Sequence, residues 1–409
     1  MHPLCLSVAL VFIGALGSLV PVAASADPHA QDQKTIGVVV YERVEYDDNI
    51  FRLADSADAQ TVLGTSQRSD RIVSSGIALM LDKAYGLQRL RLDASHMRYR
   101  YARFGYLDFS PTAYSGLWQW HLTPRLSGNV RADRQQRLTS FADYQNFSKR
   151  NIRTDVSREF DMGWEAGSRW RVLGSLSELS QRNSEVFRAE DAFTQYTAQV
   201  GLEYLSPAGN SLIVTGTESR GTFTDRTLDA ANALDTRFQQ NTVAATARWH
   251  LSAKSSIDAK LGYLTRQHQH FDQRDYSGLI GNVYFLWATT PKTQFSIRAG
   301  RDLVSFQNTA SSYYVTEGLG LSQDWRMTDK TSMRLGLSTS RQRYLGAWVA
   351  LPGPVRNDRL RGYEFAIAWE PRRYLAFKGS IKRNERTSSL SPSLHYSDRS
   401  AALTAELKF

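Results

Sequence analysis

The stretch SAALTAELKF, residues 400–409, alternates strictly between two sets of side chains. The first set is apolar and consists of Ala401, Leu403, Ala405, Leu407 and Phe409. The second set is small or polar and consists of Ser400, Ala402, Thr404, Glu406 and Lys408. Because successive side chains of a β-strand point to opposite faces, one face of this stretch suits lipid and the other suits water. The pattern is typical of a strand in a transmembrane β-barrel.

The same alternation recurs about eighteen times from residue 37 onward, in segments of about ten to fourteen residues. In lipid every backbone N–H and C=O group needs an internal partner, so only helices and closed barrels span a membrane. No segment after residue 26 is apolar enough for a spanning helix. We therefore predict an all-β, antiparallel transmembrane barrel of about eighteen strands, with sixteen as the alternative. The predicted strands are 37–46, 71–82, 88–102, 112–122, 126–137, 152–164, 169–182, 192–205, 211–222, 237–251, 256–270, 276–288, 293–304, 313–325, 331–344, 359–370, 374–386 and 395–409.

The connections between these segments alternate between short turns and longer polar loops. The short turns lie near 83–87, 123–125, 165–168, 206–210, 252–255, 289–292, 326–330 and 371–373. The longer loops include 47–70, 138–151, 223–236, 345–358 and 387–394. In outer-membrane barrels the short connections are periplasmic, so we expect both termini on the periplasmic side of a bacterial outer membrane.

Tryptophan placement supports the same architecture. Eight of the nine tryptophans lie within about five residues of a short turn. They are Trp118, Trp120, Trp164, Trp170, Trp249, Trp287, Trp325 and Trp369, whereas Trp348 lies in a long loop. Aromatic rings prefer the level of the lipid headgroups, so these residues predict an aromatic girdle. The alternative, the buried core of a soluble sandwich, does not explain why they follow one class of turn.

The N-terminal region has the features of an export signal. Residues 4–22 are apolar and precede Ala24-Ser25-Ala26, a pattern typical of a signal-peptide cleavage site. We expect a signal peptide at 1–26, a short periplasmic leader at 27–36 and the barrel at 37–409. No Lys or Arg precedes the apolar run, which leaves an uncleaved anchor as the alternative. The single cysteine, Cys5, lies inside this segment, so we expect no disulfide and no thiolate metal site in the barrel.

Composition and motifs exclude several functions. The 409 residues carry a formal net charge of +10, but Lys and Arg are spread along the whole chain. Without a basic tract or zinc-ligand spacing, nucleic acid is not an expected partner. No G-x-S-x-G or H-E-x-x-H motif is present, so we predict neither an enzyme nor a cofactor.

Two groups of residues invite a metal hypothesis. Asp47-Asp48-Asn49 is rich in oxygen ligands but lacks calcium-loop spacing, so we interpret it as a turn. His250, His268 and His270 fall on inward phases of adjacent strands, where we interpret them as a solvated rim of the lumen. We therefore expect no metal site.

The phase of each strand also defines the lumen. The cations that we predict to line it and to contact a ligand are Arg131, Arg137, Arg153, Arg248, Lys260, Arg266, Arg298, Arg334, Lys378 and Lys382. The acids predicted on the same face are Asp93, Asp133, Asp155, Glu159, Asp161, Glu203, Asp258, Asp302, Glu364 and Glu406. The two signs nearly balance, so cross-strand ion pairs that brace the wall are one hypothesis. Contact with a passing glycan is the other, because guanidinium groups stack on sugar rings and bind carboxylates.

Two stretches resemble a known family. Residues 46–53, YDDNIFRL, form the first, and the second runs from 261–263 to 274–278, with Trp287 and 289–293 beyond it. Together they resemble the putative β-barrel porin family, and within it the exosortase-associated exopolysaccharide export barrels of the EpsL type. The resemblance implies an outer-membrane protein that serves secretion of a polysaccharide made at the inner membrane.

The hypothesis for function is a passive outer-membrane channel for export of an extracellular polysaccharide. A general diffusion porin without an obvious long constriction loop, a non-conducting scaffold and an outer-membrane hydrolase remain as alternatives, although loop 47–70 has the length to fold inward. Expected partners are the polysaccharide, outer-membrane lipid and periplasmic export proteins. Phe409, preceded by alternating apolar residues, also resembles the assembly signal that the barrel-assembly machinery recognises.

Overall fold

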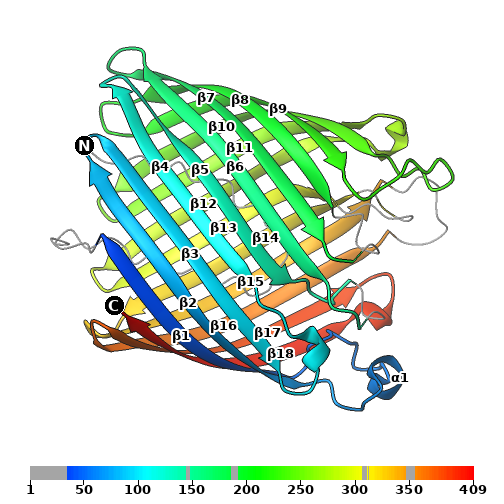
Figure 1. The fold of residues 1–409 in the computed structure, drawn as a ribbon. Helices are drawn as coiled ribbons and strands as arrows, with labels where there is room; N and C mark the ends of the chain where they lie inside the picture. The colour runs from blue at the N-terminus through cyan, green and yellow to red at the C-terminus, as the bar shows by residue number, and fades with distance from the viewer. Residues whose placement is uncertain (1–34, 144–147, 186–191, 306–310, 312, 347–354) are drawn as a thin grey trace.

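One closed β-barrel accounts for most of the structure (Figure 1). The computed structural model describes residues 35–143, 148–185, 192–305, 311, 313–346 and 355–409. The strands are β1 (Ile36–Asp47), β2 (Asp70–Tyr85), β3 (Gln88–Tyr101), β4 (Thr112–Thr123), β5 (Leu126–Leu138), β6 (Ile152–Glu165), β7 (Trp170–Asn183), β8 (Phe193–Leu205), β9 (Ser211–Phe223), β10 (Arg237–Ser252), β11 (Ser255–His268), β12 (Tyr276–Thr290), β13 (Thr293–Ser305), β14 (Tyr313–Arg326), β15 (Thr331–Leu345), β16 (Asn357–Arg372), β17 (Leu375–Ser388) and β18 (Tyr396–Lys408). The predicted signal peptide, most of the predicted leader and Cys5 lie outside the described residues.

Pairing between β1 and β18 closes the barrel. The two strands run antiparallel, from Val39 opposite Lys408 to Asp47 opposite Ser400. Closure leaves no strand edge in lipid and gives the backbone groups of both strands their partners. The predicted eighteen antiparallel strands are confirmed, and the alternative of sixteen is wrong. The predicted boundaries lie within about three residues of the observed ones.

The register of this closure also sets the two faces of the wall. Val40 lies opposite Leu407 and Val44 lies opposite Leu403, and all four side chains are exposed on the outer face. Glu406, one residue out of phase with Leu407, lies on the inner face and binds Lys378. The predicted alternation in the last strand is therefore confirmed.

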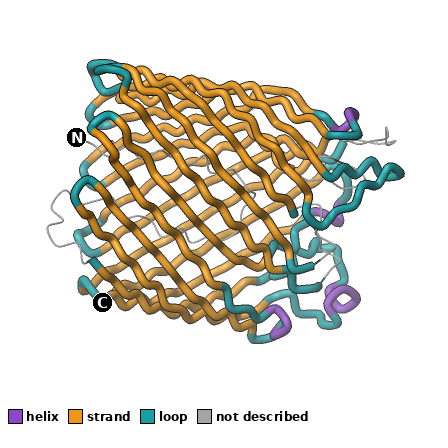
Figure 2. Tube along the Cα trace, turned by 45° about the horizontal axis from the view of Figure 1, so that its top comes forward, coloured by secondary structure: helices purple, strands orange, loops and turns teal. Residues whose placement is uncertain are grey.

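The two ends of the barrel differ, and we call them the turn end and the loop end. β1 begins and β18 ends at the turn end, beside the short connections (Figure 1). The loop end carries the short helix α1 (Ala59–Leu63) and the 3-10 helices η1 (Gly105–Leu107), η3 (Asp272–Arg274) and η4 (Pro392–Leu394) (Figure 2). No helix in the described part of the chain is long and apolar enough to cross a membrane. The predicted alternation of short and long connections is confirmed.

Tryptophans form the predicted girdle near the turn end. Seven of them are well exposed, namely Trp118, Trp164, Trp170, Trp249, Trp287, Trp325 and Trp369. Trp120 is buried instead, because its ring stacks on Phe160 at 5.8 Å between centroids and lies beside Gly128. Exposed indole rings on the outer wall fit the level of the lipid headgroups. Trp348 lies outside the described residues.

Gly128 tests this packing. A Cβ atom there would lie 2.0 Å from the Asp161 carbonyl oxygen and 2.6 Å from Trp120 Cζ2. We expect Gly128→Ala to lower the free energy of unfolding by about 1–3 kcal/mol, measured by urea denaturation of the detergent-folded barrel. Gly216→Ala is the matched control, because no atom lies within 4 Å of a Cβ at that strand position. Equal stability of the two variants would contradict the packing described.

Candidate functional site in the barrel lumen

Ion pairs occupy much of the inner wall. Arg131 on β5 donates to Glu159 and Asp161 on β6, each at 3.0 Å, and Asn129 donates to Asp161 at 2.8 Å. Arg137 and Arg153 share Asp155, at 2.9 and 2.8 Å. Such networks join neighbouring strands and satisfy carboxylates that the lumen wall partly buries.

Six of the ten cations predicted to contact a ligand belong to such pairs. They are Arg131, Arg137, Arg153, Arg334 with Asp324, Lys378 with Glu406 and Lys382 with Glu364. For these six the bracing hypothesis holds, because each already has a carboxylate partner. Four of the ten acids predicted on the inner face form no ion pair within the described ranges, namely Asp93, Asp133, Asp258 and Asp302.

Arg266 has a different environment. Its Nε and Nη2 atoms donate to Gln240 Oε1 at 3.1 and 2.7 Å, and its guanidinium carbon lies 4.6 Å from the centre of the Phe238 ring. The side chain is buried, with a residual exposure of 8%. Arg266 therefore packs into the inner wall near the loop end and offers little surface to a ligand.

The remaining three cations gather on one wall, which we call the Arg298 wall. Arg248 on β10, Lys260 on β11 and Arg298 on β13 form no ion pair with any residue that the structure describes. Register places Asp258 opposite Arg248, Tyr284 opposite Asp258 and Arg298 opposite Tyr284, so these side chains follow one another around the wall. The Arg298 guanidinium carbon lies 5.0 Å from the centre of the Tyr284 ring.

Small side chains continue the inner face beside this wall. Gly320 lies opposite Arg298, and Ser338 and Gly362 follow on the next strands. Because these residues project little into the lumen, Arg298 and Tyr284 stand out from the surface around them. A planar cation beside an aromatic ring, next to small side chains, is an arrangement suited to bind a sugar ring.

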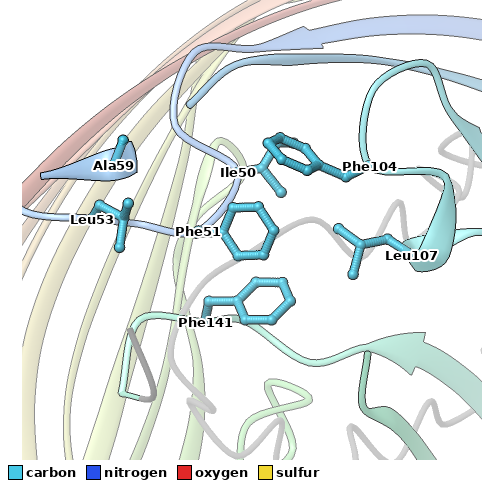
Figure 3. Close-up of a cluster of buried hydrophobic side chains, with 7 residues drawn as sticks. All are labelled: Ile50, Phe51, Leu53, Ala59, Phe104, Leu107 and Phe141. Atoms are coloured by element: carbon cyan, nitrogen blue, oxygen red, sulfur yellow. The ribbon is translucent and has the colours of Figure 1, made fainter. Parts of the chain in front are cut away.

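Three loops cover part of the mouth at the loop end. Phe51, from the β1–β2 loop, packs between Phe104 and Phe141, at 4.9 and 4.6 Å between ring centroids (Figure 3). Leu107 completes this apolar cluster from η1 and is fully buried. The cluster joins the β1–β2, β3–β4 and β5–β6 loops into one unit. The sequence analysis left open that loop 47–70 folds inward, and the β1–β2 loop does pack against its neighbours at the mouth.

Charged groups attach these loops to the wall at β16–β18. We call Asp143, Arg356, Asp358 and Arg386 the mouth clamp. Asp143, in the β5–β6 loop, accepts hydrogen bonds from Arg356 and Arg386, each at 2.9 Å. Arg386 lies on the inner face of β17, and β18 and β1–β4 separate it from β5 along the wall. Arg52 adds a second attachment, to Asp47 at 2.9 Å and to Asp398 on β18 at 3.3 Å. The β5–β6 loop therefore reaches across the mouth.

Burial and charge act in opposite directions on Arg356, which lies just before β16. Burial alone would lower the pKa of its guanidinium, but Asp358 and Asp143 outweigh it and raise the pKa above the usual value. Asp358 is fully buried and accepts from Arg356 at 2.6 Å. The clamp therefore stays charged at all pH values at which Asp143 and Asp358 are ionised.

The residues considered as metal ligands have structural roles. Asn49 N–H donates to Asp47, and Arg399 N–H donates to Asp48 at 2.7 Å, so the turn interpretation is confirmed. His268 is buried beside Asp275 rather than solvated, and that expectation was wrong. His270 lies beyond the end of β11, against Asp235, and His250 is exposed near the turn end. No metal-binding group of these residue types occurs in the described ranges.

Arg274 connects loops at the mouth, and the sequence analysis did not predict this role. It is fully buried in η3 and donates to the Asn232 carbonyl at 2.7 Å and to the Ser311 carbonyl at 3.3 Å. Burial lowers its pKa to about 10. The residue lies in the stretch 274–278 that carried the family resemblance, but its partners lie in loops distant in sequence. Both distinctive stretches, 46–53 and 274–278, thus hold loops together at the mouth.

Breaking the mouth clamp tests this arrangement. Asp143→Asn removes the charge that holds Arg356 and Arg386, so we expect trypsin to cut the β5–β6 loop at Lys149 or Arg150 about tenfold faster, as an interaction of about 1–3 kcal/mol is lost. The barrel itself should remain folded by heat-modifiable migration. Asp229→Asn is the control, because that carboxylate binds only Ala231 and Asn232 of its own loop. Unchanged cleavage of Asp143→Asn would contradict the clamp.

The fold matches outer-membrane porins. OpdK from Pseudomonas aeruginosa aligns over 91% of this chain and 99% of its own, with 7% identity and a TM-score of 0.50. OpdL from Pseudomonas aeruginosa has 12% identity and a TM-score of 0.48, and OccAB3 from Acinetobacter baumannii has 8% identity and a TM-score of 0.48, with the same two coverages. At such identities the likeness concerns the fold alone. No curated protein matches the sequence significantly.

The sequence gives the family directly. The family profile described as Putative beta-barrel porin 2 matches residues 181–409, which is more than half of the chain and includes β8–β18. The closed barrel, its apolar outer face and its aromatic girdle agree with that match and with a location in the bacterial outer membrane. The chain belongs to the Putative beta-barrel porin 2 family of outer-membrane β-barrels.

Proposed function

We propose that this protein is a passive outer-membrane conduit for an extracellular polysaccharide, of the exosortase-associated type. The observation that carries the proposal is the Arg298 wall, where three inward cations form no ion pair within the described chain, beside Tyr284. Elsewhere on the inner face the predicted cations are paired or buried. A glycan needs weak, exchangeable contacts, and Tyr and Arg faces supply stacking while Lys and Arg supply hydrogen bonds.

The proposed path runs from the turn end to the loop end. In this orientation both ends of the barrel segment are periplasmic. The short connections at the turn end favour it, because short connections are periplasmic in outer-membrane barrels. The polymer would enter from periplasmic export proteins, pass the Arg298 wall and leave beside the mouth clamp. Its movement would be driven by synthesis at the inner membrane, because the barrel offers contacts but no energy source.

Assembly would depend on Phe409. Its backbone pairs with Val38 at 2.8 Å, which completes the closing strand pair, while 61% of the residue surface remains exposed. An exposed terminal ring is accessible to the barrel-assembly machinery, which supports the proposed role as an assembly signal. Outer-membrane lipid and the assembly machinery are thus proposed partners of the barrel.

A general diffusion porin is the second candidate. The observation that favours it is the set of loops packed at the mouth, because an inward constriction suits small solutes better than a polymer. The family description is also that of a porin. A scaffold without conductance and a hydrolase have no comparable support, and a porin-like family is consistent with a protein that is not an enzyme.

The Arg298 wall can be removed without disturbing any described ion pair. We expect Arg248→Gln/Lys260→Gln/Arg298→Gln to fold normally, to reduce the anion-to-cation permeability ratio in planar bilayers by roughly two- to fivefold and to reduce polymer secretion. The control is Arg131→Gln, which removes the cation that binds Glu159 and Asp161 and should destabilise the barrel by about 1–3 kcal/mol.

Three outcomes separate the candidate functions. Lower selectivity together with lower secretion supports polysaccharide export. Lower selectivity with normal secretion supports a diffusion porin. Absence of conductance in the wild-type protein would overturn both channels and leave the scaffold.

A further inference from the structure

The outer face of the barrel carries an unusual group of arginines near the loop end. We call it the arginine patch, and it consists of Arg341, Arg343, Arg359, Arg361, Arg383 and Arg399. These residues lie on four adjacent strands, β15–β18, which run side by side (Figure 1). Each of them lies an odd number of positions from the inner-face residues of its strand, so its side chain is on the opposite face. The patch therefore points away from the lumen.

The neighbours on β16 place the patch relative to the membrane. Arg359 and Arg361 share a face with Tyr363, Phe365 and Trp369, all of which are exposed. From Trp369 at the turn end, this face is apolar up to Tyr363 and then becomes basic. Because an apolar band about 25 Å tall spans the lipid, the arginines lie at the boundary opposite the tryptophan girdle, at the level of the headgroups.

Pairing within the patch brings like charges together. Arg341 lies directly opposite Arg359 in the β15–β16 register, and Arg383 lies directly opposite Arg399 in the β17–β18 register. Like charges directly opposite in a sheet destabilise it. In this position a low-dielectric lipid phase on one side would strengthen the repulsion.

Carboxylates do not compensate this charge. The patch contains one carboxylate, Glu385, which lies directly opposite Arg361 and binds Arg383 at 2.5 Å. The other patch arginines form no ion pair in the described chain, and Arg341 donates to the Asn357 amide oxygen at 2.8 Å. On the opposite wall, two outward arginines have acidic partners: Arg158 binds Glu178 at 2.7 Å, and Arg220 binds Glu218 at 2.8 Å. Arg98 and Arg100 on β3 also point outward without an ion pair in the described chain, but among the described strands only this side places arginines directly opposite each other on the outer face.

We propose that the arginine patch binds the phosphorylated headgroup of an outer-leaflet glycolipid of the lipid A class. Guanidinium groups bind phosphate oxygens in a bidentate geometry, and two phosphates on one headgroup can neutralise both Arg–Arg pairs. The acyl chains of the same lipid would lie on the apolar face below, against Phe365. The inference concerns the lipid side of the barrel and is independent of what passes through the lumen, but it uses the proposed orientation with the loop end outward.

The test compares two four-residue variants of the full barrel in detergent. The first, Arg341→Gln/Arg359→Gln/Arg383→Gln/Arg399→Gln, removes both Arg–Arg pairs. The matched control, Arg158→Gln/Glu178→Gln/Arg220→Gln/Glu218→Gln, removes two outward ion pairs on the opposite wall and leaves the net charge unchanged. Native mass spectrometry measures binding of bisphosphorylated lipid A, and the unfolding temperature is measured with and without that lipid.

We expect the patch variant to bind lipid A at least about a hundredfold more weakly than the wild type, whereas the control binds normally. Without lipid A the patch variant should unfold at a higher temperature than the wild type, because the repulsion is gone, and with lipid A the order should reverse. If the four-residue variant does not fold, Arg383→Gln/Arg399→Gln provides the same comparison with one pair.

Other probes identify the source of the phosphate. Phosphatidylglycerol, dephosphorylated lipid A and inorganic phosphate should each bind much more weakly than lipid A and should not reverse the order of unfolding temperatures. Equal binding of lipid A by the wild type and the patch variant would overturn the proposal. Equal binding of dephosphorylated lipid A, of phosphatidylglycerol or of inorganic phosphate by the wild type would overturn it as well, since the patch would then not select a phosphorylated glycolipid.

Discussion

β1 and β18 pair antiparallel and thereby close the sheet into a barrel. In lipid an unpaired strand edge would leave a row of backbone groups without partners, so the sheet has to close. Closure at Val40 opposite Leu407 fixes the register, and a slip by one residue would exchange the lipid face for the lumen face. All later features, including the tryptophan girdle and the Arg298 wall, depend on this choice of phase.

The inner wall contains two kinds of cation: those that are bound in ion pairs between strands and those that are free of an ion pair in the described chain. Cations such as Arg131 and Lys382 have carboxylate partners on the neighbouring strand, so their charge holds strands together rather than attracting solutes. Arg298 has an aromatic neighbour in place of a carboxylate, which leaves its hydrogen-bonding groups accessible. A lumen that contains nearly equal numbers of acids and bases can therefore still present a basic surface at one place.

The two ends of the barrel reach their stability in different ways. At the turn end short connections and tryptophans suffice, because little polypeptide extends beyond the lipid. At the loop end Phe51 joins the β1–β2 loop to the β5–β6 loop, Arg52 joins the β1–β2 loop to β18, and Asp143 joins the β5–β6 loop to β17. Because Asp143 reaches β17 past β18 and β1–β4, some of the residues that stabilise the loops lie across the mouth of the barrel.

From the sequence alone we predicted about eighteen strands, with sixteen left open, together with their faces and the two kinds of connection, because alternation with period two and turn composition are local properties. The sequence also placed Arg131 and Arg298 correctly on the inner face, since phase follows from the strand. Only the tertiary structure decided that Arg131 is paired and Arg298 is not, that Arg386 holds Asp143, and that Arg341 faces Arg359. Such contacts depend on cross-strand register and on loops far apart in sequence, which the local pattern does not encode.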